Sequence, residues 1–128
     1  MDANLLAEIK TEIQKRLCEL GIPSRLKGSQ YMQTAISLLI ENSDLILDVR
    51  ENLYAKIAEK HQTSVSRVSS AILRATQTSW DKGDKEVLFG YFRYTIAGGN
   101  KPSVNEYLAM VTDCIKLKYY RQIKNGTI

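Results

Sequence analysis

The sequence predicts an all-α fold in a single domain, and three observations support this prediction. Apolar residues recur at steps of three and four along most of the chain, and no stretch alternates convincingly with the period of two that marks a strand. A chain of 128 residues suits one domain and can bury a sizeable core. With 44% hydrophobic and 25% charged residues, the composition is close to the globular average, which argues against disordered, collagen-like and disulfide-stapled chains.

Two helices open the chain. An apolar stripe predicts the first helix over residues 5–20, Gly21 follows as a left-handed residue that ends it, and Pro23 prevents it from resuming. The second helix starts near Ser29 and ends before Asn42. The side chains expected inside are Leu5, Leu6, Ile9, Ile13, Leu17 and Leu20 of the first helix, and Tyr31, Met32, Ala35, Ile36 and Leu39 of the second.

A helix-turn-helix is predicted over about residues 53–80. Residues 44–51 form a short helix that leads into a second one over residues 53–60, and Thr63 and Ser64 then offer hydroxyl groups to cap the next helix. That helix runs from about Val65 to Ser79 or Trp80. Its inner face is Val65, Val68, Ala71, Ile72 and Ala75, and its outer face is Ser66, Arg67, Ser70, Leu73, Arg74 and Gln77. A short helix, a tight turn and a longer helix with a polar outer face have the layout of a DNA reader.

Two more helices are predicted after the helix-turn-helix. Residues 86–94 carry aromatic side chains, and Trp80, Tyr91, Phe92 and Tyr94 are expected in the core. Ser103 and Glu106 fit a capping box at the start of the last helix. Its inner face is Val104, Tyr107, Leu108, Val111, Ile115 and either Leu117 or Lys118, and it ends in a basic run from Lys116 to Lys124. Cys18 and Cys114 are each expected on an apolar helix face as buried, reduced thiols.

The residues that could carry chemistry argue against an enzyme. His61 is the only histidine, which leaves one candidate base, and it is expected near a helix end without a chemical role. No GxxxxGK[ST] or GxGxxG loop and no metal-ligand cluster is present, so no cofactor and no metal are expected. No apolar run is long enough to span a membrane and no signal peptide is visible, which predicts a cytoplasmic protein. The net charge of +4 is compatible with a nucleic-acid partner.

One set of residues, spread along nearly the whole chain, carries a resemblance to a known family. These residues are Gly21, Ile22, Pro23, Lys27, Gly28, Tyr31, Ala35, Ile36, Leu53, Tyr54, Ile57, Ala58, Ser66, Arg67, Val68, Ala71, Ile72, Trp80, Gly83, Phe92, Tyr94, Thr95, Lys101, Pro102, Glu106, Tyr107, Ala109, Met110 and Val111. In their order, spacing and helix pattern, residues 5–117 resemble the DNA-binding effector domain of the stage-zero sporulation master regulator family of endospore-forming bacteria.

The resemblance implies a six-helix effector domain of the winged-helix-like superfamily, without a sheet, over residues 1–128. It further implies that the helix-turn-helix enters the major groove of double-stranded DNA and that copies bind in tandem on adjacent boxes. Family members usually carry an N-terminal receiver domain that restrains the effector, whereas here Met1 starts directly on the first effector helix. The sequence fits both a stand-alone effector and an effector taken from a longer chain.

The reading face of the predicted recognition helix departs from the family pattern. The family has an acidic residue, then an arginine, then a second arginine one turn later, at the positions of Ser69, Ser70 and Leu73. Arg67 keeps a family arginine, and Arg74 stands where the pattern has histidine. An arginine that binds guanine with two hydrogen bonds contributes about 1–3 kcal/mol of base discrimination. Two lost arginines therefore remove about 2–6 kcal/mol, and the target box of the family is not expected to apply.

Two hypotheses of function follow. In the first, the protein is a DNA-binding transcriptional regulator with altered base specificity, whose site is Thr63, Ser64, Ser66, Arg67, Ser69, Ser70, Leu73, Arg74 and Gln77. Thr63, Ser64 and the helix N-terminus would hold one phosphate, and Lys116, Lys118 and Arg121 are candidates for further phosphate contacts. In the second, it is a protein-interaction module that pairs with a full-length sporulation regulator and binds DNA weakly or not at all.

Overall fold

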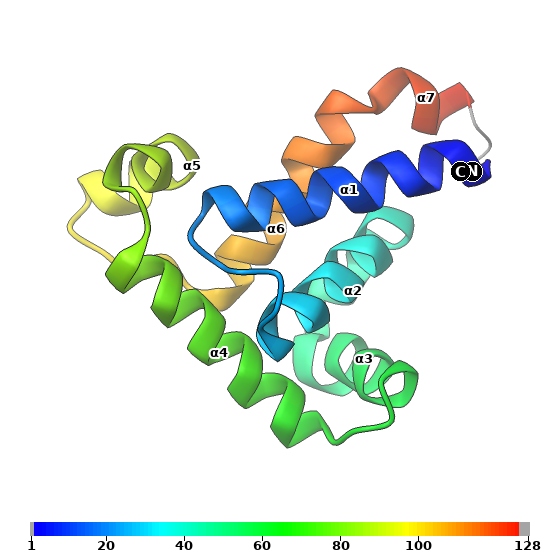
Figure 1. Cartoon of the computed structure of the whole chain (residues 1–128), viewed down its shortest axis with the longest axis horizontal. Helices are drawn as coiled ribbons and strands as arrows, with labels where there is room; N and C mark the ends of the chain where they lie inside the picture. Colours follow the sequence, from blue (N-terminus) through cyan, green and yellow to red (C-terminus); the bar gives the residue numbers. More distant parts are fainter. Residues whose placement is uncertain (1, 126–128) are drawn as a thin grey trace.

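The computed structural model describes residues 2–125 and arranges them in α-helices and two short irregular helices (Figure 1). In chain order the elements are α1 (Ala3–Glu19), α2 (Lys27–Glu41), the 3₁₀ helix η1 (Ser43–Asp48), the π-helix η2 (Val49–Tyr54), α3 (Ala55–Lys60), α4 (Val65–Lys82), α5 (Lys85–Ala97), α6 (Val104–Lys118) and α7 (Tyr120–Asn125). No strand occurs among residues 2–125, so the predicted all-α class is confirmed. None of the described helices is both long and apolar enough to cross a membrane.

Residues 2–125 form seven α-helices where the sequence predicts six. The basic run expected at the end of the last helix is split at Tyr119, where φ is −107° and ψ is 21°, and its second half becomes α7. Residues 44–51 adopt the irregular turns of η1 and η2 in place of one short α-helix. The recognition helix α4 extends to Lys82, beyond the predicted end at Trp80.

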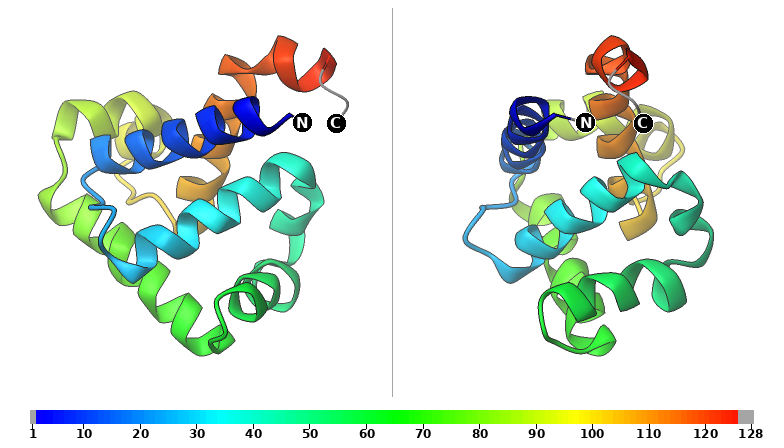
Figure 2. Two further views of the ribbon diagram at one scale, coloured as in Figure 1. Left: turned by 45° about the vertical axis from the view of Figure 1, so that its right-hand side comes forward. Right: turned by 90° about the vertical axis from the view of Figure 1, so that its right-hand side faces the viewer.

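Helix α2 lies at the centre of the fold and packs against α1, α4 and α6 (Figures 1 and 2). All of the inward side chains predicted for α2 are buried. Those of the first helix are buried too, except Leu6, which is 36% exposed. The apolar stripe of α1 therefore faces α2 and α6, as its spacing predicts.

The ends of α1 and α4 meet closely. Gly21 has φ 85°, and hydrogen bonds from its N–H to Cys18 O and from Ile22 N–H to Leu17 O form the motif with which a left-handed residue ends a helix. A Cβ atom on Gly21 would lie 2.9 Å from Cα of Gly83, just after α4, so both positions need glycine. The predicted role of Gly21 is confirmed.

Buried hydrogen bonds fasten the same junction to α6. The Ser79 hydroxyl donates to Leu20 O at the end of α1, and it accepts a hydrogen bond of 2.9 Å from the Tyr107 hydroxyl. Ser79 and Tyr107 are both fully buried, so these bonds satisfy groups that would otherwise be costly to remove from water. One serine thus links α1, α4 and α6.

A second close approach fixes α4 against α2. A Cβ atom on Gly28 would lie 2.7 Å from Cβ of Ala75 and would also collide with the carbonyl oxygen of Ala71. Only glycine allows the two backbones to come this near. The position of the recognition helix is therefore set by direct contact with the central helix.

Several expectations about side chains are wrong, including the inward position of Leu117 or Lys118 at the end of α6, since both are exposed. Cys18 is exposed, because it follows Leu17 by one residue and so lies about 100° around α1 from the buried stripe. Cys114 is half-buried, not fully buried. Of the aromatic residues expected in the core, Phe92 is buried, with its ring centroid 4.6 Å from that of Tyr107, but Tyr94 is 89% exposed.

The predicted capping box forms only in part. The Ser103 hydroxyl accepts from Glu106 N–H at 3.1 Å, as expected of the first half of the box. The Glu106 carboxylate does not return to the backbone of Ser103, because it accepts a hydrogen bond from the Thr95 hydroxyl of α5. The carboxylate therefore joins α5 to α6.

Candidate nucleic-acid interface

The helix-turn-helix is built from α3, a turn of four residues and α4. Helix α3 ends with hydrogen bonds from Thr63 N–H to Ala58 O at 2.9 Å and from Gln62 N–H to Glu59 O at 3.3 Å. Gln62 has φ 54°, which makes it the left-handed residue that closes the helix. Ser64 then caps α4, since its hydroxyl accepts from Arg67 N–H at 3.1 Å. The predicted turn and its serine cap are confirmed.

The two faces of α4 separate as the sequence predicts. Val68, Ala71, Ile72 and Ala75 are buried, together with Thr76 and Ser79, and Val65 is half-buried. The outer face is exposed and consists of Ser66, Arg67, Ser70, Leu73, Arg74 and Gln77. Of the three other residues of the predicted DNA site, Thr63 and Ser69 are half-buried and the capping residue Ser64 is exposed. Residues 65–80 contain no carboxylate, so nothing along this stretch would repel a phosphate.

The two arginines lie toward one side of the outer face. Arg67 and Arg74 are seven residues apart, which places them in line on the same side of the helix, about two turns apart. Both line an open hollow between α4 and the first turn of α2, together with Lys27 and Tyr31 of α2. Leu73 does not line this hollow, and it is 49% exposed. The outer face thus has a cationic edge beside α2 and a neutral remainder.

His61 ends α3 and borders the same hollow. Its Nε2 lies 2.8 Å from the Thr34 hydroxyl of α2, and its ring meets Tyr31 edge-on with the centroids 5.0 Å apart. Burial, followed by the nearby cations Lys60 and Lys27, lowers the pKa of the imidazole below its ordinary value. The His61 ring is therefore fixed in place by Thr34 and Tyr31 and is uncharged at neutral pH.

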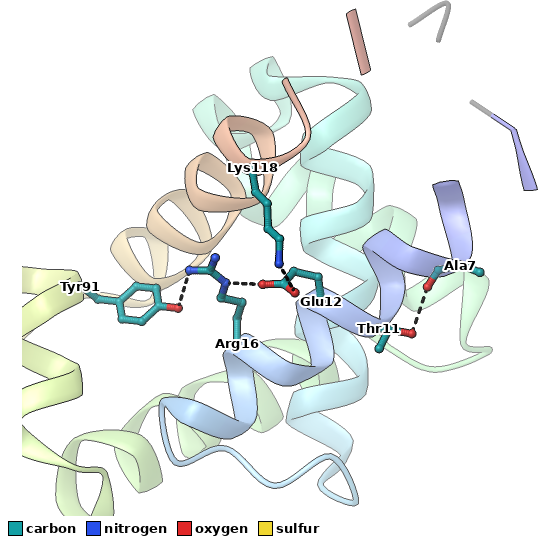
Figure 3. A network of polar contacts seen from close by, with 6 residues as sticks. All are labelled: Ala7, Thr11, Glu12, Arg16, Tyr91 and Lys118. Atoms are coloured by element: carbon teal, nitrogen blue, oxygen red, sulfur yellow. Dashed lines mark hydrogen bonds and ion pairs between the residues drawn. The ribbon is translucent and has the colours of Figure 1, made fainter. Parts of the chain in front are cut away.

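The basic C-terminal run lies at the far end of the molecule from the turn between α3 and α4 (Figures 1 and 2). Lys118 is already engaged there, because its Nζ lies 2.9 Å from Oε1 of the buried Glu12. Arg16 approaches the same carboxylate at 2.8 Å and donates to the Tyr91 hydroxyl at 3.1 Å (Figure 3). Hydrogen bonds from Lys118 and then Arg16 lower the pKa of Glu12. This network joins α1, α5 and α6 and lies apart from the outer face of α4.

Sequence reasoning missed the residues that border α4 from other elements. Lys27, Tyr31 and His61 belong to α2 and to the turn, and only the close crossing of α2 and α4 brings them beside the arginines. The glycine after Lys27 is the signal that could have revealed this, since a glycine near a helix start often marks close backbone approach.

A capped helix that follows a tight turn, held on a central helix and presenting a polar face without carboxylates over residues 65–80, has the layout of the helix-turn-helix class of DNA-binding domains. Residues 13–115 match the family model described as "Sporulation initiation factor Spo0A C terminal". The chain belongs to this family, whose members are DNA-binding domains of sporulation regulators and not enzymes.

Proposed function

We propose that this domain regulates transcription by reading the major groove with the outer face of α4, at a DNA sequence that differs from the box of its family. The observation that carries the proposal is the composition of that face. Arg67 and Arg74 remain exposed on it, whereas Ser69, Ser70 and Leu73 occupy the positions of the charged readers of the family. The scaffold for docking is kept, while the groups that select bases are changed.

The two arginines are the strongest readers on the face. Each can donate two hydrogen bonds to the O6 and N7 atoms of guanine. Ser70 and Gln77 supply weaker polar contacts, and Leu73 can meet a thymine methyl group. The preferred DNA sequence should therefore specify few guanines, and it should tolerate a thymine opposite Leu73.

Contacts to the DNA backbone set the register of α4. The hydroxyls of Thr63 and Ser64 lie at the N-terminus of an 18-residue helix, where free N–H groups favour a phosphate. The proposal places the duplex along α4, and it therefore assigns no phosphate to Lys116 and Lys118 at the end of α6 or to Arg121 of α7. Binding of copies in tandem remains part of the proposal, and it would show as cooperative occupation of adjacent sites.

Selection of bound duplexes from a random pool, followed by a salt titration on the enriched sequence, tests this function. The proposal expects an enriched motif and an affinity that falls steeply with salt, by a slope of about 0.9 for each phosphate contacted. Weak binding without enrichment and with a flat salt response would contradict it. The same titration on the family box measures the change of specificity.

A second candidate function is a protein-interaction module that pairs with a full-length sporulation regulator. The observation in its favour is Leu73, a large apolar side chain 49% exposed at the middle of the outer face. Mixing the domain with a full-length relative during sedimentation distinguishes the two functions. A stable heterocomplex that Leu73→Ser abolishes, in the absence of DNA binding, would favour the module.

A further inference from the structure

An open hollow of about 680 Å³ lies beside the recognition helix. The first turn of α2 forms one wall with Lys27 and Tyr31, the turn of the helix-turn-helix closes one end with His61, and α4 forms the other wall with Arg67 and Arg74. Its walls cannot drift apart freely, because the backbones of α2 and α4 are in contact at Gly28 and Ala71.

The charges around the hollow are of one sign. Lys27, Arg67 and Arg74 line it, no aspartate or glutamate does, and none of these three cations forms an ion pair with any residue in the described range 2–125. Three cations held near one another without a counter-charge repel one another and favour an anion between them. Helix α2 begins at Lys27 with no side chain capping its first N–H groups, which adds partial positive charge at the same wall.

His61 can change the charge of this hollow. The groups that face it are Lys27 and Tyr31 of α2, Lys60 of α3, Arg67 and Arg74 of α4 and, in a second, smaller hollow that His61 also lines, Lys10 of α1. Every charged member of this set is a cation, and burial followed by the nearby cations Lys60 and Lys27 lowers the pKa of the imidazole in the free protein. An anion placed in the hollow reverses that preference, since it attracts the imidazolium form.

We propose that this hollow binds one phosphate of the DNA backbone at Lys27, beside the arginines of α4 that face the bases, and that His61 takes up a proton when the phosphate enters. The proposal rests on the proposed DNA-binding function and adds to it a contact from α2 and a dependence on pH. Because the bound state holds the proton more tightly than the free state, affinity for DNA rises as the pH falls toward the range in which free His61 titrates. A rise of one unit in the pKa of His61 on binding would give a tenfold tighter complex at low pH.

Fluorescence anisotropy on one fixed duplex, between pH 5.5 and 8 at constant ionic strength, tests the pH dependence. The parent should bind about three- to tenfold more tightly at the acid end, and His61→Gln should bind with little change across the range. His61 is the only histidine in the sequence, so a loss of the dependence in this variant assigns it without ambiguity. An NMR titration of the His61 ring should show a higher pKa with DNA than without.

Lys27→Gln tests the phosphate directly. It should reduce the slope of log affinity against log salt by about one while leaving the preferred sequence unchanged. Lys15→Gln, which removes an exposed cation of α1 away from the hollow, is the matched control and should leave the slope as it is. A parent that binds DNA, with no pH dependence and with an unchanged slope in Lys27→Gln, overturns the phosphate site. A parent that binds no DNA at any salt concentration overturns the proposed function itself.

Discussion

Arg67 and Arg74 offer the clearest test at the scale of single residues. Both are exposed on the polar side of α4 and contribute nothing to the core. Replacing either by alanine should weaken specific DNA binding by about 1–3 kcal/mol, or roughly 5- to 150-fold. Mobility-shift titrations at moderate salt measure the loss.

Cys18→Ser is the control for these arginine variants, because Cys18 is exposed on α1 away from α4. It should bind DNA like the parent. If Arg67→Ala and Arg74→Ala also bind like the parent, α4 does not read the groove.

Glu12 should make the stability of the domain depend on pH. Its pKa is lowered below the ordinary value of 4.5, so its stabilising contribution is present above that value and is lost as the pH falls through the lowered pKa. Glu12→Gln should therefore lower the free energy of unfolding by about 1–2 kcal/mol at neutral pH, and the difference from the parent should vanish in acid. Urea unfolding at several pH values measures it.

Glu8→Gln provides the comparison for Glu12→Gln. Glu8 is exposed one turn earlier on α1 and has no ion pair within the described part of the chain. Its replacement should change stability little at any pH. Equal losses of unfolding free energy in the two variants would mean that the change in net charge, and not the buried network around Glu12, causes the destabilisation.

The same residues show what single-residue prediction from sequence can and cannot reach. The spacing of Leu5, Ile9 and Ile13 identifies the buried stripe of α1 correctly. Glu12 and Arg16 lie within or beside that stripe, but charged side chains are not expected there from the sequence. Their position depends on hydrogen bonds with Lys118 and Tyr91, which lie in distant parts of the chain. Pairing across the fold leaves no periodic signal.

At the scale of elements, the end of α3 contains a strained residue. Gln62 occupies a left-handed conformation that a Cβ atom disfavours by about 1–2 kcal/mol, whereas glycine adopts it freely. Part of this gain is lost because glycine is more flexible in the unfolded chain. Gln62→Gly should therefore stabilise the domain by up to about 1 kcal/mol. Thermal unfolding of Gln62→Gly and of Gln62→Ala, which keeps the strain, checks this, and equal stability of the two variants would contradict it.

The outer face of α4 allows a test of specificity. The domain should bind the family box little better than random duplex, and Ser69→Glu, Ser70→Arg and Leu73→Arg together should restore the preference. The reason is that phosphate contacts still set the register and only base discrimination is missing. The three positions lie within little more than one helical turn, so their effects are not expected to add.

Competition between the box and scrambled DNA measures this specificity. A parent that already prefers the family box by about a hundredfold would show that other residues read the bases. A folded triple variant that binds DNA without preference would contradict the retained docking geometry.

Local signals predict helix ends better than they predict irregular segments. Gly21 and Ser64 act as the sequence indicates, because a left-handed glycine and a serine cap depend only on neighbouring residues. The turns of η1 and η2 were not foreseen, since their form depends on packing against α2 and α4. Glu106 departs from its predicted partner for the same reason, because Thr95 of α5 competes for its carboxylate.

At the scale of the whole molecule, α6 completes the core. Its side chains Tyr107, Leu108, Val111 and Ile115 are fully buried against helices from the first half of the chain. A chain ending at Ser103 should therefore lose cooperative unfolding, because it exposes the apolar faces of α1 and α2. A chain ending at Tyr119 loses only α7 and should unfold cooperatively. Thermal unfolding of both shortened chains, followed by circular dichroism, tests this. A cooperative transition in the chain that ends at Ser103 would contradict the role of α6 in the core.

The arrangement of the whole molecule is also where the interface was least predictable. The recognition helix and most of its outer face follow from the order and spacing of residues 53–80. The hollow beside it does not, because it requires the start of α2 to lie next to Arg67 and Arg74. That arrangement depends on two backbones in contact at Gly28, which no periodicity encodes.

The contact between Gly28 and α4 has a consequence for how such a domain can evolve. Because of this contact, the positions of α4 that the fold requires are Ala71, Ala75 and their buried neighbours, which hold the helix in place. Ser70, Leu73 and Gln77 are exposed and can be exchanged at little cost to stability. A duplicated copy of such a gene could thus acquire a new set of target sites within a few mutations, without passing through an unfolded intermediate.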